Sequence, residues 1–150
     1  MELTCPIENV ESLVPHSHQM VLLDRITEFG DNFLIAESEI RPDHILIKKG
    51  RLAAFAGIEI MAQGVAAWAG CMAAKANEPV RLGYLLGTRK LHLYQQDIAI
   101  GSCLQTKITM SIQDASGFGV FDCQLIDLAD NRVILEGALN VFSPKDNISS

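Results

Sequence analysis

Residues 52–74 read LAAFAGIEIMAQGVAAWAGCMAA, an apolar run of helical length around which the rest of the chain is organised. Its polar members are Glu59 and Gln63, which a helix would place one turn apart on the same face. A carboxylate inside such a run is costly unless it is paired or protonated. Because burial favours the protonated form of a carboxyl group, the run predicts an acid–base site around Glu59, with the imidazole of His44 a short loop upstream.

The same run is long enough to cross a membrane. Alanine and glycine dominate it, however, and a charged side chain at the centre of a span costs about 2.5–3.5 kcal/mol. A helix that is apolar on all sides is more often buried in a protein core. We therefore expect a core helix and no transmembrane segment.

Length and composition predict one globular domain. The chain has 150 residues, of which 49% are hydrophobic and 20% charged, and we expect a single domain over 1–150 with its core at about 13–142 and a loose tail at 143–150. The formal net charge of −6 argues against general nucleic-acid binding. The cysteines contain no CxxC pair and the first residues do not form a signal peptide, so we expect free thiols in a reducing cytoplasm. His16 and His18 form a close pair without a neighbouring carboxylate or cysteine, and we predict no metal site and no cofactor.

The segments on both sides of the run have strand-like patterns, and their order indicates an α+β fold. Alternating strands suit an antiparallel sheet with one buried face. One apolar helix against one such sheet requires the sheet to curl around the helix, which is the hotdog fold. The curled sheet keeps an open edge, so we expect a dimer with a continuous sheet. The predicted strands are residues 18–29, 33–40, 81–94, 104–112, 117–127 and 132–142, with a helical turn at 7–13 and a polar loop at 41–50.

Three stretches of the chain resemble the 3-hydroxyacyl-acyl-carrier-protein dehydratases. Residues 14–25, VPHSHQMVLLDR, are similar to the opening strand of that family, and residues 83–90, GYLLGTRK, to the strand after its central helix. Residues 57–63, GIEIMAQ, resemble the helix motif, in which an acid precedes Ala-Met-Ala-Gln or a close variant. The resemblance covers roughly residues 13–142, and it is strongest to the dehydratase-like proteins of bacterial aryl-polyene gene clusters.

The resemblance implies roles for individual residues. It makes Glu59 the catalytic carboxylate, His44 the catalytic histidine and Gln63 the amide that orients the carboxylate. The backbone N–H of Ala54, at the start of the helix, matches the family's oxyanion contact. The family's Gly-His-Phe-Pro-Gly loop reads DHILIKKG at residues 43–50, so the proline after the histidine is missing here.

The resemblance also implies a reaction, the dehydration of a 3-hydroxyacyl thioester on acyl carrier protein to the trans-2-enoyl thioester, in fatty-acid or aryl-polyene type biosynthesis. His44 would remove the α-proton, Glu59 would protonate the departing hydroxyl, and the two would meet across a dimer interface. The Ala54 N–H would polarise the thioester carbonyl. An acidic carrier protein would dock on the basic residues around the run, which are Lys48, Lys49, Arg51, Arg89 and Lys90.

Other interpretations of the same residues stay open at this point. The altered loop fits a half-site or non-catalytic subunit that completes a heterodimeric dehydratase, or an acyl-binding module. Glu59 could also activate water, which would make the chain an acyl thioesterase. Each site residue has a structural interpretation too: Glu59 and Gln63 as a polar pair, His44 as a loop histidine, His16 and His92 as packing residues, and Trp68 and Met72 as core or tunnel wall.

Overall fold

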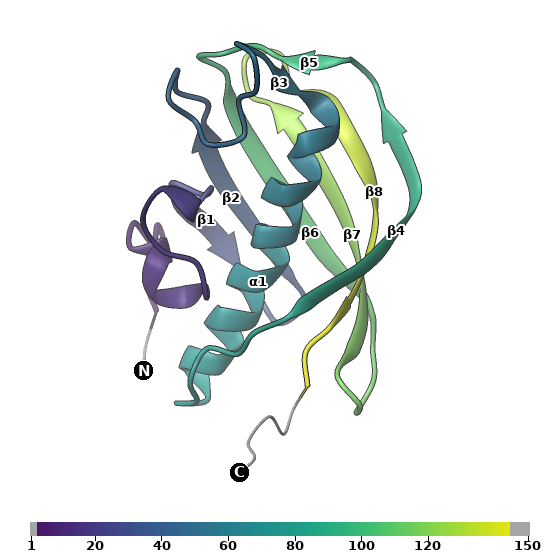
Figure 1. Cartoon of the computed structure of the whole chain (residues 1–150). Helices are drawn as coiled ribbons and strands as arrows, with labels where there is room; N and C mark the ends of the chain where they lie inside the picture. Colours follow the sequence, from purple (N-terminus) through teal and green to yellow (C-terminus); the bar gives the residue numbers. More distant parts are fainter. Residues whose placement is uncertain (1–2, 145–150) are drawn as a thin grey trace.

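The computed structural model describes residues 3–144, and an antiparallel sheet that curls around one helix dominates it (Figure 1). The helix, α1, spans Gly57–Lys75. The sheet has six strands in the order β1-β2-β6-β7-β8-β4, and the short strands β3 and β5 form a separate pair. The strands are β1 Arg25–Phe29, β2 Phe33–Glu39, β3 Leu52–Ala53, β4 Tyr84–Leu93, β5 Asp97–Ile98, β6 Cys103–Gln113, β7 Phe118–Asp127 and β8 Arg132–Phe142, and the 3-10 helices are η1 Val10–Leu13, η2 His18–Met20 and η3 Ala54–Ala56.

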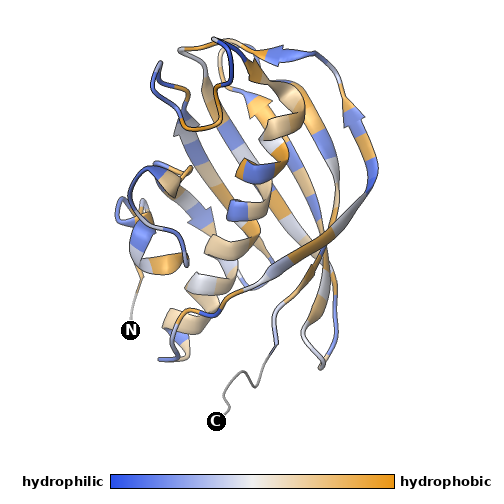
Figure 2. Ribbon diagram, viewed as in Figure 1, coloured by the Kyte–Doolittle hydropathy of each residue, from blue (hydrophilic) through white to orange (hydrophobic). Residues whose placement is uncertain are grey.

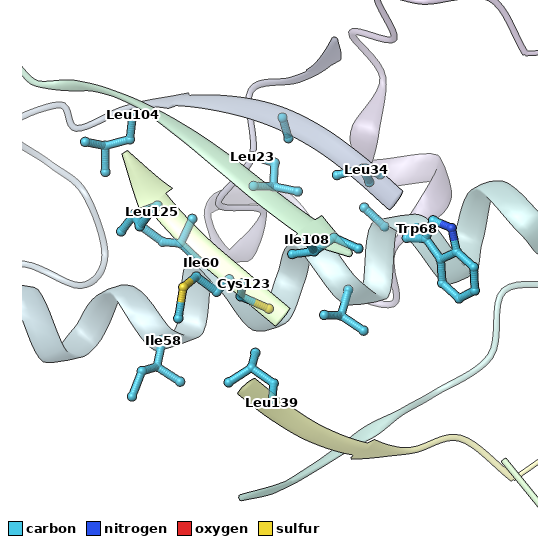
Figure 3. Close-up of a cluster of buried hydrophobic side chains, with 14 of the residues drawn as sticks. Leu23, Leu34, Ile58, Ile60, Trp68, Leu104, Ile108, Cys123, Leu125 and Leu139 are labelled. Carbon is cyan, nitrogen blue, oxygen red and sulfur yellow. The ribbon is translucent and has the colours of Figure 1, made fainter. Parts of the chain in front are cut away.

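This architecture confirms the predicted hotdog fold, with a long central helix against a curled antiparallel sheet. Figure 2 shows α1 as a mostly apolar helix with polar positions in its first half. The stretch Ala54–Lys75 is the one described helix long and apolar enough to cross a membrane, but 61% of its apolar window is buried inside the protein. Figure 3 shows what buries it: Ile58, Ile60 and Trp68 lie among Leu34, Leu104, Ile108, Leu125 and Leu139 from the sheet.

The strands with clear alternation form where the sequence predicts them. On β6, Leu104, Thr106 and Ile108 are buried, and the hairpin β7–β8 turns at Asn131, whose φ is +58°. A register shift between Met110 and Ile112 ends this alternation, and Ile112 beyond it is exposed. The predicted tail 143–150 extends beyond the described residues from position 145 onward.

The prediction of one strand over residues 18–29 is wrong in its first half. Residues 18–20 form η2, and the strand β1 begins only at Arg25. Backbone groups of Met20, Leu22 and Leu23 are bonded to side chains instead of a neighbouring strand. Gln63 binds all three residues from α1, and the Ser38 hydroxyl donates to the Leu22 carbonyl at 2.7 Å. This polar clamp keeps the segment 20–23 out of the sheet and against the helix.

The strand β4 lies at one edge of the sheet and pairs with β8 on one side only among the described residues (Figure 1). Large apolar side chains are exposed along it and just before it, with Leu82 54% and Leu86 58% exposed. Proteins commonly cover an apolar, unpaired edge strand by pairing it with a strand of another chain. The dimer with a continuous sheet stays a prediction, and the edge strand β4 is the surface on which it would form.

Candidate functional site

A cavity of about 340 Å³ runs along one face of α1. Glu59, Ala62, Ala66 and Ala69 line it, and their spacing of three or four residues places them on one helix face. The small alanines leave space that larger side chains would fill. The other walls come from residues 15–22, Ile45 and Leu46, residues 81–85, and the sheet residues Gln113, Gly119, Phe121 and Val141.

Glu59 lies in the first turn of α1 at this cavity, but it is exposed. The expectation of a carboxyl group enclosed in an apolar pocket is therefore wrong for the chain by itself. The reason is the face on which it lies: its neighbours Ile58 and Ile60 are buried in the core, whereas Glu59 lies on the cavity face of the helix. An acidic side chain in the first turn also fits the positive end of the helix dipole. Within residues 3–144, no hydrogen bond or ion pair engages its carboxylate, which leaves it free for a ligand.

Gln63 is buried one turn further along, and its amide is bonded to the segment before β1. Its Oε1 accepts from the N–H groups of Leu22 and, at 3.3 Å, Leu23, and its Nε2 donates to the Met20 carbonyl at 2.9 Å. No hydrogen bond joins Gln63 to Glu59 in the described part of the chain, so the carboxylate-orienting role stays a prediction without a contact that supports it. Gln63 instead fixes the cavity wall that Met20 and Leu22 form.

His44 lies in the loop between β2 and β3, partly buried. The loop is ordered by backbone hydrogen bonds from His44 N–H to the Arg41 carbonyl at 2.9 Å and from Ile47 N–H to the His44 carbonyl at 3.0 Å. Burial lowers the pKa of the His44 imidazole from its ordinary value, and the positive charge of Arg41 lowers it further. The negative charges of Asp24 and Asp43 oppose this shift but do not cancel it. The ring is therefore held in its neutral form to a lower pH than an exposed histidine.

The structure does not bring His44 and Glu59 of one chain into a common cavity. Ile45 and Leu46 line the cavity that contains Glu59, whereas His44 does not. The expected meeting of the two across a subunit boundary stays a prediction. In a single chain, the two predicted site residues therefore lie at different places.

The Ala54 N–H is not available as the expected oxyanion contact. Ala54 is fully buried, and its N–H donates to the Gln96 carbonyl at 2.7 Å. The Gln96 carbonyl reaches the start of the helix through the short ribbon β3–β5, in which Ala53 pairs with Asp97. Strands of two residues leave no periodic pattern from which to predict this contact.

The predicted docking residues are exposed but do not form one surface. Backbone hydrogen bonds between Lys48 and Arg51 form an isolated antiparallel β-bridge that closes a tight turn. Within this turn, Lys49 and Gly50 have φ of +53° and +74°. Arg51 is paired with Asp97 at 2.6 Å. Arg89 lies on β4, while Lys90 lines a hollow on the outer face of the sheet with Lys107, Asp122 and Glu136, away from the cavity.

Two aromatic residues of the cavity extend the sequence-based picture. Trp68 lines it and packs edge-on against Phe121, with 5.4 Å between ring centroids, and its indole N–H donates to the Gly30 carbonyl at 3.0 Å. His16 also lines the cavity, and its Nδ1 is buried without a hydrogen-bond partner in the described chain. Of the two, only Trp68 was assigned in advance to a core or tunnel wall, because its helical spacing points there. No cluster of three or more His, Cys, Asp or Glu residues that could hold a metal occurs among residues 3–144.

Comparison with known proteins decides the family. A family model described as ApeP dehydratase matches residues 8–150. The chain belongs to the ApeP-like dehydratase family. The match covers nearly the whole chain, so it includes the central helix, the curled sheet and the residues that line the cavity. Membership supports a hydro-lyase activity for this chain.

Solved structures agree with this family at the level of the fold. The dehydratase heterocomplex ApeI:P from Xenorhabdus doucetiae contains a chain that is 28% identical, with 96% of this chain and 94% of that chain covered and a TM-score of 0.83. An uncharacterised protein from Pyrococcus horikoshii is 14% identical, with 95% and 97% covered and a TM-score of 0.63. A hypothetical thioesterase from Streptococcus pneumoniae, solved with coenzyme A, is 12% identical, with 79% and 83% covered and a TM-score of 0.61. No curated protein matches the chain in sequence.

Proposed function

We propose that this ApeP-like dehydratase removes water from a 3-hydroxyacyl thioester carried on acyl carrier protein, giving the trans-2-enoyl thioester. The observation that carries the proposal is the position of Glu59, a free carboxylate at a mostly apolar cavity along α1, in a chain of a dehydratase family. An acyl chain fits such a cavity, and a carboxylate at its wall is placed to move protons at the 3-hydroxyl end. The corresponding substrate is a 3-hydroxyacyl chain attached to a carrier protein in the cytoplasm.

We infer that the working unit contains two hotdog subunits. His44 and Glu59 of one chain do not share a cavity, and the exposed apolar edge β4 offers a surface for a second sheet. The similar chain from Xenorhabdus doucetiae belongs to a dehydratase heterocomplex, which favours a different hotdog subunit as the partner over a second copy of this chain. Each site would then combine a histidine from one subunit with a carboxylate from the other.

Docking of the carrier is assigned to the exposed basic residues at the loop before α1. Lys48 and Lys49 are exposed and carry no ion pair within the described residues, whereas the charge of Arg51 is compensated by Asp97. Arg89 lies apart from this loop, on β4. Reversing Lys48 and Lys49 to Glu is expected to weaken turnover of the carrier-bound substrate, while turnover of a pantetheine thioester hardly changes. Lys107→Glu, on the outer face of the sheet, is the matched control.

Mass spectrometry of a 3-hydroxyacyl carrier protein tests the reaction. The substrate is incubated with the purified chain, alone and with a second hotdog dehydratase subunit from the same cell, and loss of one water from the carrier-bound acyl group is the expected result. Glu59→Gln should lower the rate by about 10²–10⁴-fold, the range for loss of a positioned acid or base. Release of a free acid would identify a thioesterase instead. Unchanged substrate in both incubations would refute the proposed function.

A further inference from the structure

The segment 20–23 borders the cavity without belonging to the sheet. Met20 and Leu22 line the cavity beside Gln63, and the strand β1 begins only at Arg25. In the described chain, no backbone group of this segment pairs with a neighbouring strand. The side chains that bond the segment therefore decide where this wall of the cavity lies.

Two buried side chains from different elements bond the segment. Gln63 on α1 accepts from the N–H groups of Leu22 and Leu23 and donates to the Met20 carbonyl at 2.9 Å. Ser38 on β2 donates from its hydroxyl to the Leu22 carbonyl at 2.7 Å. Both side chains are only 3% exposed, so removal of either leaves backbone groups of the segment without a partner.

This wall lies one helix turn from Glu59, in the direction in which the cavity continues to Ala66 and Ala69. Gln63 follows Glu59 by four residues, which is about 6 Å along α1. An extended chain advances about 1.2 Å per bond, so an acyl chain whose reacting carbons meet Glu59 reaches the wall after about five further bonds. A short 3-hydroxyacyl chain ends before the wall, whereas a long chain has to pass it.

We propose that Gln63 and Ser38 are positioning residues that hold Met20 and Leu22 as the wall against which a long acyl chain binds. This inference rests on the proposed dehydration and identifies the part of the site that selects the chain. Neither positioning residue has a hydrogen bond to Glu59 in the described chain, so both act on the substrate through the wall.

Amide hydrogen exchange tests the hydrogen bonds without turnover. The N–H groups of Leu22 and Leu23 should exchange about tenfold faster or more in Gln63→Met, in which the side chain keeps its length but loses its amide. The amide of Ile108 on β6 reports on the sheet and should exchange as in the wild type. Unchanged protection of Leu22 and Leu23 would overturn the proposal, whether or not the chain is a dehydratase.

Chain-length selectivity tests the role of the wall. The chain, assembled with a second hotdog dehydratase subunit, is given pantetheine thioesters of 3-hydroxybutyrate and 3-hydroxydecanoate, and kcat/KM is measured for each. In Gln63→Met, the ratio of long-chain to short-chain kcat/KM should fall by about tenfold or more, because a misplacement of about 1 Å in a site can cost about 10²-fold. Ser38→Ala should lower the same ratio, since its hydroxyl bonds the same segment. Ser111→Ala, exposed on β6, is the matched control and should leave the ratio unchanged.

A carboxylate-orienting role of Gln63 predicts a different result. Gln63→Met would then lower kcat/KM equally for both thioesters and change its pH dependence, and Ser38→Ala would have no effect. Either an equal loss on both chain lengths or an unchanged ratio in Ser38→Ala would overturn the proposal. A wild type that gives no enoyl product from either thioester would refute the dehydration itself.

Discussion

Two faces of α1 use small residues for opposite purposes. Towards the sheet, glycine permits contact: a Cβ at Gly57 would lie 2.7 Å from the Leu125 side chain, and one at Gly64 would lie 3.0 Å from that of Thr106. Towards the cavity, Ala62 and Ala66 leave about 340 Å³ unfilled. Small side chains therefore give close packing on the face towards the sheet and an open cavity on the other face. What distinguishes the two faces is whether other side chains of the protein pack against them.

The comparison explains why one helix can serve both fold and site. Close approach on the sheet side buries the apolar side chains that stabilise the domain. The cavity side contributes less packing, so its residues can vary with the ligand at little cost to folding. Substitutions on the two faces should thus separate stability from activity.

The largest effect is expected at Gly70, where α1 packs against η1. A Cβ there would lie 1.8 Å from the Leu13 carbonyl oxygen, and a backbone atom cannot move aside as a side chain can. Gly70→Ala should lower the free energy of unfolding by about 3 kcal/mol, at the upper end of the cost of overpacking. Urea denaturation at fixed protein concentration measures this.

Gly87→Ala is the matched control for Gly70→Ala. An added Cβ at Gly87 meets nothing within 4 Å, and its φ lies outside the left-handed region. Its unfolding free energy should stay within about 0.5 kcal/mol of the wild type. If Gly70→Ala were equally well tolerated, the contact between α1 and η1 would be looser than the structure shows.

These contacts also show what the sequence can reveal. The length and apolarity of residues 52–74, and the alternation in β6 and the β7–β8 hairpin, predicted the curled sheet and its helix. The segment before β1 was predicted wrongly because Gln63 binds its backbone from 40 residues further along the chain. Long-range side-chain bonds of this kind have no periodic signature.

The next effect compares two neighbouring alanines on opposite faces. Ala66 lines the cavity, whereas Ala67 is fully buried in the core. Ala66→Leu should lower kcat/KM for a long acyl chain by about tenfold or more, or about 1.4 kcal/mol, and leave a short chain nearly unaffected. Ala67→Leu should instead destabilise the fold by about 1–3 kcal/mol.

Turnover of short and long 3-hydroxyacyl thioesters, together with unfolding curves of both variants, checks this pair. An equal loss of activity on both chain lengths for Ala66→Leu would mean that the cavity does not hold the acyl chain. Strong destabilisation by Ala66→Leu would mean that the face is packed rather than hollow.

The geometry of the candidate site was not predictable from the sequence, and the roles of its residues stay predictions. The pattern of residues 57–63 pointed to Glu59 and Gln63 as a pair. In the structure, Glu59 is exposed, whereas Gln63 is buried and bonded to the segment before β1. The Ala54 N–H was misassigned because the two-residue ribbon β3–β5 carries Gln96 over it. The loop that holds His44 is closed by backbone hydrogen bonds to Arg41 and from Ile47, which leave no signature in the sequence.

The smallest effect concerns the stability of Glu59→Gln. Glu59 is exposed on the cavity side and lies in the first turn of α1, where a negative charge interacts favourably with the helix dipole. Its replacement should lower the free energy of unfolding by about 0.3–1 kcal/mol at low salt, even though the same change removes most of the proposed activity. Because salt screens this interaction, the difference should shrink in about 1 M salt. A loss well above 2 kcal/mol that persists at high salt would make Glu59 a structural residue, and the cavity face of α1 would then be as important for folding as its packed face.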